Sequence, residues 1–374
     1  MDIICFSDID WDFLWQRHQQ LLTRFPKDWN ILYVQPSFIG LLIKNPIKVL
    51  PTQVENNIRI VSLPTMPFIP FSDRFSILLR KINNFLIVFW TRFFMKIYNI
   101  KNPVVIIYEP RFSCVVGKLN ELLICYEVAD DRLEFTQVPR WIKNNIDFLI
   151  QKADLVTIAS RYLYDKLVKK RRHNIFLVGN GVEVEHFKKA RKNVEIPSDI
   201  CDIKKPIVGY TGAIGEWFDF QLIENILKNY PDFSIVLIGP TFPEQRIEID
   251  RLKKSYTNFY ALGKKSYNLL PNFIRAFNVC LIPFKINELT RGVNPNKLYE
   301  YLAAGKPVIS TALPEVKKYN ETIYVAENYG EFLSYINKAL TSAHDLEKFF
   351  KIADENTWQE KAKEIMKIIQ TEKR

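Results

Sequence analysis

Cysteine and histidine are both scarce in this chain of 374 residues. The four histidines show no spacing with cysteines or carboxylates that would suit a metal ion. No compact Ser/His/Asp set is visible either, so nucleophilic hydrolysis is not expected. The five cysteines are widely scattered and form no CxxC pair: Cys5, Cys114, Cys125, Cys201 and Cys280. Thiols so placed are typical of small core residues in a reducing compartment and argue against a disulfide or metal framework.

Long hydrophobic runs are also missing. The most apolar run, Phe85–Trp90, is six residues long and is flanked by Arg80, Lys81 and Arg92. A membrane-spanning helix needs ~20 apolar residues. The first residues, Met-Asp-Ile-Ile-Cys, begin a strand and lack the basic start of a signal peptide. These features predict a cytoplasmic protein.

Acidic residues are outnumbered by basic ones, 41 against 52, which gives a net charge of +11. Such an excess favours anionic partners: nucleic acid, phosphorylated small molecules or an anionic lipid surface. Otherwise the composition is that of an ordinary globular protein, with 48% hydrophobic and 25% charged residues. The length exceeds the size at which one hydrophobic core stops growing, so we expect two domains.

Short apolar runs alternate with longer helical patterns, twice over. This alternation predicts α/β architecture with parallel sheets covered on both faces. The simplest arrangement is two Rossmann-like domains facing each other across a cleft. We expect an N-terminal Rossmann-like domain at 1–182, a charged linker at 183–205, a C-terminal Rossmann-like domain at 206–350, and a C-terminal helix at 351–374 that packs back on the N-terminal domain.

The most informative stretch runs from Asn287 to Ser310. Pro295 suits the first turn of a helix, and Gly305 suits its end. At the start of this helix, free NH groups of Asn296 and Lys297 can bind a diphosphate, with the Lys297 side chain and Arg291 close by. One turn further on, the carboxylate of Glu300 lies on the same face and can accept both ribose hydroxyls of a nucleotide. When this helix is considered alone, a scaffold role explains the residues equally well: an amphipathic helix with an i,i+3 ion pair between Lys297 and Glu300.

The sequence Pro-x-Lys-x-x-Glu-Tyr-Leu-Ala-x-Gly-Lys-Pro-Val at 295–308 strongly resembles the donor-site motif of retaining glycosyltransferases of the GT-B fold, in the large group often called family 4. The longer stretch 287–302 looks like the branch of teichuronic-acid-type and capsule or S-layer glycan transferases. Weaker matches in order and spacing extend the resemblance over almost the whole chain: 11–19, 126–131, 153–160, 179–183 and 209–215.

The resemblance implies transfer of a glycosyl group from a UDP-, GDP- or dTDP-linked sugar to a saccharide acceptor, with retention of anomeric configuration. The domain at 1–182 is expected to bind the acceptor, and the domain at 206–350 is expected to bind the donor. The acceptor is expected to be lipid-linked, and neither a metal nor another cofactor is expected. Donor binding is expected from Glu300, Asn296, Lys297, Pro295, Asn294, Gly212, Ala213 and Arg17, and catalytic roles from Arg291, Lys297, Asp131 and His18. A nucleotide-sugar 2-epimerase of the same architecture and a non-catalytic GT-B scaffold are the alternatives.

Two departures from the family pattern stand out. Many relatives have a first glutamate eight residues before the second, where this chain has Gly292, and either Glu288 or Asn294 could replace it. Many also have an Arg and a Lys in the loop after the first strand of the second domain, whereas residues 212–219 contain no cation. Positive charge at the leaving diphosphate must then come from Arg291, Lys297 or the N-terminal domain.

In the first half, Arg17 and His18 follow the first expected strand and are candidate contacts to the acceptor or donor sugar; a solvated helix face is the alternative. Asp130 and Asp131 follow another strand, and capping of the next helix would also explain them. Asp8-Ile-Asp10 looks like the metal-binding DxD motif of the other large transferase fold, but the second Rossmann-like half argues against that fold.

A basic and aromatic-rich helix is expected at 76–98, within the stretch 72–101. This stretch has six basic residues and one acid, Asp73, and aromatic residues are interleaved with them: Phe75, Phe85, Phe89, Trp90, Phe93 and Phe94. This pattern suits an anionic bilayer surface and predicts a peripheral protein on the inner face of the plasma membrane. A core helix with a solvated basic face is the alternative. Nucleic acid is not an expected partner, because no recognisable binding module accompanies the charge.

Overall fold

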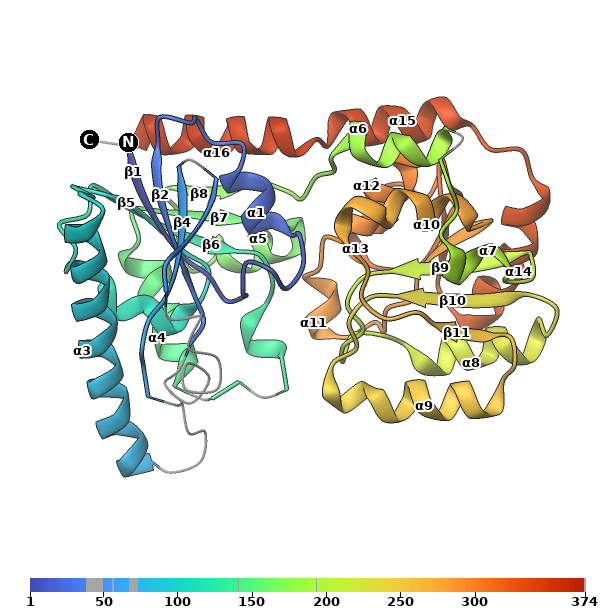
Figure 1. Cartoon of the computed structure of the whole chain (residues 1–374), viewed down its shortest axis with the longest axis horizontal. Coiled ribbons are helices and arrows are strands. Elements are labelled where there is room, and N and C mark those ends of the chain that lie inside the picture. The colour runs from blue at the N-terminus through green and yellow to red at the C-terminus, as the bar shows by residue number, and fades with distance from the viewer. Residues whose placement is uncertain are drawn as a thin grey trace. The chain divides into compact units, whose positions relative to one another are not determined.

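The computed structural model describes residues 1–37, 50–55, 57–66, 73–136, 138–139, 141–192 and 194–372, with only the backbone described at 73–76. The chain forms two compact units (Figure 1). The first comprises Met1–Val178 and Gln359–Arg374, and the second comprises Gly179–Trp358. Each has its own hydrophobic core.

Among the described residues, eight strands form the sheet of the first unit, in the order β3-β4-β2-β1-β5-β6-β7-β8. Neighbouring strands are parallel except β3 and β4. The residues of the apolar strands are buried on both faces of the sheet. This is the covered parallel sheet that the alternation of apolar runs and helical patterns predicted. The strands are β1 (Asp2–Phe6), β2 (Asn30–Gln35), β3 (Thr52–Glu55), β4 (Ile58–Ser62), β5 (Val104–Ile107), β6 (Leu123–Val128), β7 (Leu155–Ile158) and β8 (Ile175–Leu177).

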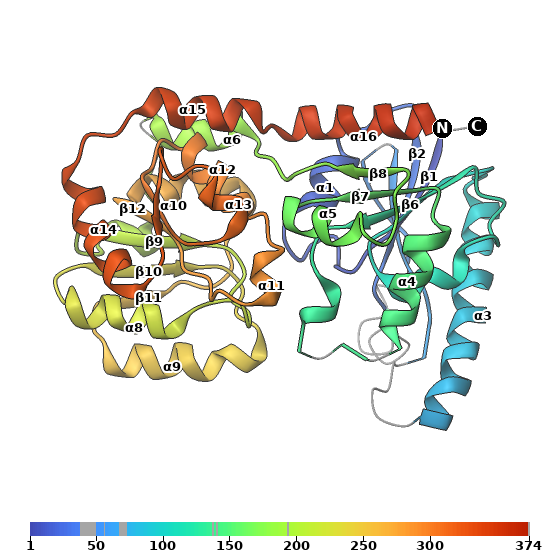
Figure 2. The ribbon, with the colours of Figure 1, turned by 180° about the vertical axis from the view of Figure 1, so that it is seen from behind.

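Helices cover this sheet, and α3 lies along one side of the unit (Figures 1 and 2). Ile87 and Phe94 of α3 pack into the core. The helix ends at Ile97, one residue before the expected end, and Asn99 then adopts a left-handed conformation (φ 52°). Ser72 lies outside the described residues. The helices are α1 (Arg17–Leu22), α3 (Asp73–Ile97), α4 (Ile142–Lys152), α5 (Arg161–Leu167) and α16 (Trp358–Glu372), with the 3₁₀ helices η2 (Pro110–Val115) and η3 (Arg132–Glu134).

The sheet of the second unit has the order β11-β10-β9-β12-β13-β14, with all described pairs parallel. The chain builds outward from β9 in one direction and then, from β12, in the other. This is the doubly wound order, in which ligands bind outside the carboxyl ends of the two strands at the reversal. The strands are β9 (Ile207–Thr211), β10 (Ser234–Ile238), β11 (Phe259–Ala261), β12 (Val279–Ile282), β13 (Val308–Thr311) and β14 (Tyr324–Ala326).

The helices of the second unit include segments that were expected as a linker. Residues 183–205 belong to this unit, and Phe187 and Ile200 are buried in its core. Their helices are only four residues long, so they leave no periodic signal in the sequence. The helices are α6 (Val184–Phe187), η4 (Lys188–Arg191), α7 (Ser198–Cys201), α8 (Phe220–Asn229), η5 (Pro243–Gln245), α9 (Arg246–Ser255), η6 (Tyr267–Leu269), α10 (Leu270–Ala276), α11 (Glu288–Arg291), α12 (Asn296–Ala303), α13 (Pro314–Lys317), α14 (Tyr329–Thr341) and α15 (Leu346–Glu355).

The expected α/β class, with two sheets of mostly parallel strands, is confirmed. Residues from Gln359 onward group with the first unit, whereas 351–358 belong to the second. Cys5, Cys125 and Cys280 are buried, and burial raises the pKa of each thiol, so they are unreactive core residues. In the described parts of the chain, no helix has both the length and the apolar character needed to cross a bilayer.

Candidate functional site

The strongest candidate site lies in the second unit, where α12 begins. Pro295 is the N-cap residue, with extended backbone angles (φ −76°, ψ 115°), and the helix starts at Asn296. The sequence predicted Pro295 in the first turn of the helix, whereas it lies at the N-cap, directly before that turn. Its fixed φ and missing N–H suit either position. Gly305 follows the helix with φ +70°, and the backbone N–H of Lys306 donates to the Tyr301 carbonyl at 3.0 Å. The predicted helix end at Gly305 is confirmed.

Lys297 reaches across to the end of β9. A Cβ atom built on Gly212 would lie 2.2 Å from Lys297 Cε and 2.5 Å from Nζ, and Gly212 has φ +138°. A side chain at this position would be strained by the backbone angle and would displace the lysine. The ammonium lies 5.2 Å from the centroid of the Tyr210 ring and 5.5 Å from that of Phe284. These contacts fix a positive charge at the carboxyl edge of the sheet.

The loop after β9 is held from both sides. The Tyr301 hydroxyl accepts from the backbone N–H of Thr211 at 2.8 Å, which ties α12 to the end of β9. The Tyr210 hydroxyl donates to the carbonyl of Ala213 at 2.7 Å, so Ala213 is buried against the same strand end. The fold thus brings together Gly212, Ala213 and Lys297, which the sequence predicted as parts of one site.

Glu300 lies one helical turn after Lys297 and is half-buried. Burial raises the pKa of this carboxyl to about 7, although the positive charge of Lys297 acts in the opposite direction. A carboxylate that is poorly solvated has unused capacity to accept hydrogen bonds. It can therefore accept two neighbouring hydroxyls of a ligand more favourably than a fully hydrated carboxylate could.

Asn296, the first residue of α12, has a buried side-chain oxygen without a hydrogen-bond partner among the described residues. The oxygen and nitrogen of an asparagine amide exchange places by a flip of the side chain. In the flipped orientation an NH₂ group takes the place of this oxygen in the first turn of the helix, where backbone N–H groups also lack acceptors from a preceding turn. Such a set of donors suits an anion.

The other predicted donor residues have partners inside the unit. Arg291 is half-exposed and forms an ion pair with Glu288, at 2.7 Å between Nη1 and Oε1. Asn294 is buried, and its side-chain oxygen accepts from the Tyr299 hydroxyl at 3.2 Å. Of the two possible replacements for the carboxylate missing at Gly292, Asn294 thus supports α12 from inside, whereas Glu288 is bound to Arg291.

A cation that the sequence reasoning missed lies beside the loop 212–219. Lys285 follows β12, and its ammonium donates to the carbonyl of Glu216 at 3.1 Å. The backbone N–H of Lys285 also donates to the carbonyl of Trp217 at 2.8 Å. The loop lacks a cation of its own, but the neighbouring strand end supplies one. The available signal in the sequence was the position of Lys285, shortly after the apolar strand β12.

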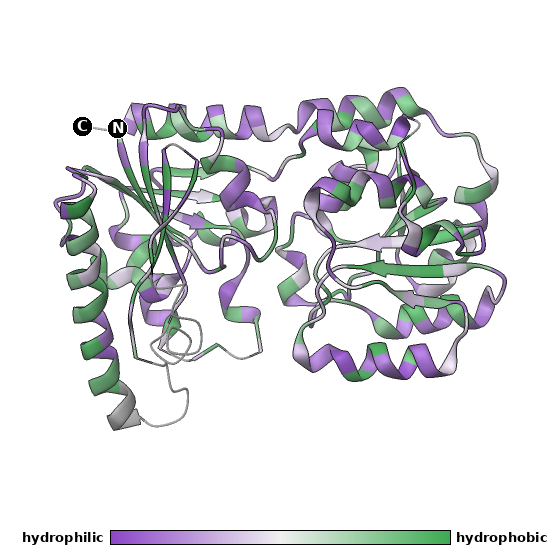
Figure 3. Cartoon of the chain, viewed as in Figure 1, coloured by the Kyte–Doolittle hydropathy of each residue, from purple (hydrophilic) through white to green (hydrophobic). Residues whose placement is uncertain are grey.

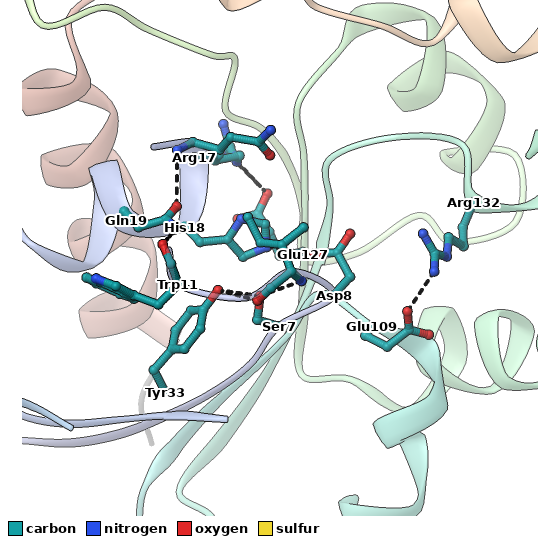
Figure 4. A network of polar contacts seen from close by, with 12 residues as sticks. Ser7, Asp8, Trp11, Arg17, His18, Gln19, Tyr33, Glu109, Glu127 and Arg132 are labelled. Atoms are coloured by element: carbon teal, nitrogen blue, oxygen red, sulfur yellow. Dashed lines mark hydrogen bonds and ion pairs between the residues drawn. The ribbon is translucent and has the colours of Figure 1, made fainter. Parts of the chain in front are cut away.

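The first unit carries a polar cluster at the carboxyl ends of β1, β5 and β6 (Figure 4). Arg17 is buried, and its guanidinium lies 3.0 Å from the carboxylate of the buried Glu127 and donates to the carbonyl of Val178 at 2.9 Å. His18 is buried too. The alternative that Arg17 and His18 form a solvated helix face is therefore wrong.

His18 lies between Asp8 and Tyr108. Its Nε2 is 2.9 Å from Asp8 Oδ1 without the alignment of a hydrogen bond, and its ring centroid is 3.8 Å from that of Tyr108. Burial alone would raise the pKa of Asp8, but His18 and, more weakly, Arg132 outweigh it and lower the pKa to about 2. Across the described residues, no group of three or more His, Cys, Asp or Glu side chains could hold a metal ion.

Asp131 caps the 3₁₀ helix η3, and its carboxylate lies 2.7 Å from the ammonium of Lys166. Glu109, which sequence reasoning did not single out, is fully buried and holds the guanidinium groups of Arg111 and Arg132 at 3.1 and 2.9 Å. Buried carboxylates need such partners. The capping role suggested as an alternative for Asp131 is present, and its neighbours are charged.

Comparison with known proteins adds independent findings. Residues 205–342 match the family model described as glycosyl transferases group 1. TuaH of Bacillus subtilis (strain 168), named as a teichuronic acid biosynthesis glycosyltransferase, is 31% identical over 173 residues, which is 46% of this chain and 43% of TuaH. The chain thus covers less than half the length of that relative.

Solved structures resemble the chain over its whole length. A sucrose-phosphate synthase from Thermosynechococcus elongatus has a TM-score of 0.73 at 16% identity, covering 99% of this chain and 98% of that one. Anabaena HepE, solved with UDP and glucose, has a TM-score of 0.73 at 13% identity, covering 99% of both chains. The protein therefore has the GT-B fold, and residues 205–342 are similar to the glycosyl transferases of group 1.

Proposed function

We propose that this protein transfers a glycosyl group from a nucleotide sugar to a saccharide acceptor, without a metal ion and with retention of configuration. The observation that carries the proposal is Lys297 over the Cβ-free surface of Gly212, with the poorly solvated Glu300 one turn further along α12. The first supplies a fixed cation for a diphosphate, and the second supplies acceptors for the two ribose hydroxyls. HepE was solved with UDP and with UDP-glucose, which favours UDP as the nucleotide.

In this proposal the chain's own groups stabilise the leaving diphosphate. Negative charge develops on its oxygen atoms as the glycosidic bond breaks. The backbone N–H groups at the start of α12, the Asn296 amide and the ammonium groups of Lys297 and Lys285 can stabilise it. Because these groups are held in place before reaction, little reorganisation is needed when the charge forms. This arrangement supplies the positive charge that a metal ion provides in other transferases.

A matched pair of ligands tests the donor site. Lys297→Met should weaken UDP binding at least about tenfold in calorimetry, because a charge-assisted contact is lost. Binding of uridine, which has no phosphate, should change less than about twofold. Lys253→Met, an exposed lysine on α9, serves as the control. Equal losses for UDP and uridine, or no loss for UDP, would place the diphosphate elsewhere.

Turnover needs its own test. Incubation with a panel of UDP, GDP and dTDP sugars and lipid-linked saccharides should give a glycosylated product with retained configuration. Interconversion of a nucleotide sugar in the absence of any acceptor would indicate an epimerase instead. Nucleotide binding without any turnover would indicate a non-catalytic scaffold.

The acceptor is proposed to be lipid-linked, because α3 carries many hydrophobic residues along its length (Figure 3) and several of them are exposed. Large hydrophobic side chains spaced three or four positions apart are 38–68% exposed on this helix: Leu78, Ile82, Phe85, Phe89, Phe93 and Ile97. Residues three and four apart lie on one helix face. Ile87 and Phe94 of α3 pack into the core, but the exposed apolar side chains favour a bilayer surface over the alternative of a core helix with a solvated basic face.

Basic side chains accompany the stripe. Lys81, Arg92 and Lys96 are exposed on the same helix, and Arg80 lies 5.1 Å from the ring of Trp141. An apolar face flanked by lysine and arginine suits the surface of an anionic bilayer. We therefore place the protein in the cytoplasm, bound peripherally to the inner face of the plasma membrane. The relation to TuaH favours assembly of a cell-envelope polysaccharide as the process.

Vesicle flotation tests this placement. Wild type should float with vesicles of phosphatidylcholine and phosphatidylglycerol but not with phosphatidylcholine alone. The triple variant Phe85→Ser, Phe89→Ser and Phe93→Ser should stay at the bottom of the gradient while binding UDP normally. Phe148→Ser, an exposed phenylalanine on α4, is the control. A wild-type protein that never floats would refute the membrane proposal and leave the donor-site test unaffected.

A further inference from the structure

A cavity of about 570 Å³ lies in the second unit at the amino end of β14. Its walls come from residues 320–325, from the end of α14 and from the loop that leads into α15. All strands of this sheet are parallel, so their amino ends share one edge and their carboxyl ends the other. The candidate donor site occupies the carboxyl edge. The cavity is thus a separate feature of the same unit.

Aromatic rings form one side of the cavity. The ring centroids of Tyr324 and Tyr335 are 5.4 Å apart, and His344 meets Tyr324 edge-on at 6.1 Å. The three residues are half-buried, so part of each ring reaches the cavity. Phe349 lies 6.0 Å from His344 and is buried beneath it. Such a group offers a rigid apolar surface with polar tips.

His344 also offers a defined hydrogen-bonding group. Its Nε2 lies 2.8 Å from the carbonyl oxygen of Ala339. A carbonyl only accepts hydrogen bonds, so Nε2 carries the proton and Nδ1 of the neutral ring is an acceptor. Asn320, Thr322 and Ser342 add hydroxyl and amide groups to the lining. These groups can donate and accept, which suits a ligand rich in hydroxyls.

The charges of the lining balance. Lys338 and Lys348 are opposed by Glu321 and Asp345. The Lys348 ammonium lies 3.6 Å from the Asp345 carboxylate, and the Lys338 ammonium lies over the rings of Tyr324 and Tyr335 at 5.7 and 6.0 Å. A phosphate or a nucleotide would meet two carboxylates as well as two lysines. The lining therefore favours an uncharged ligand.

We propose that this cavity binds a neutral saccharide, separately from the donor site. The apolar face of a sugar ring would pack on Tyr324 and Tyr335 in place of the exposed Lys338 side chain, which lies over both rings. The hydroxyls of the sugar would bond to His344 Nδ1 and to the amide and hydroxyl groups of the rim. The volume accommodates a small saccharide, within the range of about 300–1,000 Å³ common for ligand sites. A transferase with such a site can retain a glycan independently of the donor.

Saturation-transfer NMR and calorimetry with maltose, cellobiose, lactose and sucrose test the proposal on the full chain. At least one of these disaccharides should bind, and Tyr335→Ala should weaken its binding at least about tenfold. His344→Ala is the second variant, in case the first fails to fold. Tyr164→Ala, a half-buried tyrosine on α5 of the first unit, is the control and should bind normally.

The site must also be independent of the nucleotide. Addition of UDP, or the variant Glu300→Ala, should leave disaccharide binding unchanged. Three results would overturn the proposal: no binding of any of the four disaccharides, binding that neither cavity variant weakens, or binding that UDP displaces. Because UDP affinity is measured separately, failure here is distinguishable from failure of the donor site.

Discussion

The substitution Glu300→Gln should change the stability of the fold and, at the proposed donor site, the affinity for nucleotide. In the folded protein the pKa of Glu300 is about 7, against 4.5 as its ordinary value. The folded state thus holds this proton more tightly than the unfolded state, so stability falls as the pH rises from 4.5 to 7 and is constant above that range. The rise in pKa corresponds to roughly 3 kcal/mol. Solvent reaches part of the side chain, so we expect about 1–3 kcal/mol.

Glu300→Gln mimics the protonated carboxyl and should remove this penalty. In urea unfolding at pH 8 the variant should be more stable than wild type by about 1–3 kcal/mol, and the difference should vanish near pH 4.5. Glu347→Gln, an exposed glutamate on α15, should show no such dependence on pH.

The same variant should bind UDP more weakly. A neutral amide replaces a charged acceptor at the ribose hydroxyls, which should lower the affinity roughly 5- to 30-fold at pH 8. A stable variant with reduced UDP affinity is the result that the site geometry requires. A variant less stable than wild type at pH 8, or one with unchanged UDP affinity, would refute the reasoning about Glu300.

Three further substitutions test other parts of the molecule in urea unfolding. Gly239→Ala should destabilise the second unit by at least about 2 kcal/mol, because its Cβ would lie 1.9 Å from the carbonyl oxygen of Gly212. The control Gly117→Ala has φ +74° and open space around it, so it should cost only about 1 kcal/mol, and equal losses would contradict this account. Arg17→Met should lower the free energy of unfolding by about 3–5 kcal/mol, because it leaves the buried carboxylate of Glu127 without its ion-pair partner. The second substitution Glu127→Leu should restore most of this stability, and no recovery would show that the ion pair is not the cause. Asp8→Asn should lower the free energy of unfolding by about 1–2 kcal/mol at neutral pH, since the pKa of Asp8 is lowered from 3.8 to about 2 in the folded protein. The difference in stability from wild type should shrink as the pH falls from 3.8 to about 2, and a difference that stays constant would exclude the pairing with His18.

Local chemistry determined much of what the sequence predicted correctly. Continuous β-branched runs such as Val104–Ile107 bury side chains on both faces of a strand, which is typical of a sheet covered on both sides. The α/β class therefore followed from these runs and from their alternation with helical patterns along the chain. The end of α12 at Gly305 followed in the same way, because glycine alone adopts its backbone angles without strain. The i,i+3 spacing of Lys297 and Glu300 placed them on one helix face before any tertiary contact was known.

Tertiary structure decided which polar residues lie together. Glu127 and Arg17 are 110 positions apart in the chain, and no local pattern indicates that one neutralises the other inside the core. Lys285 likewise becomes the cation beside the loop 212–219 only because β12 lies next to β9. Periodicity also failed for helices of four residues, which is why residues 183–205 looked like a linker. Patterns within one element are fixed by the backbone period, whereas ion pairs and charged sites depend on which strand ends the fold brings side by side.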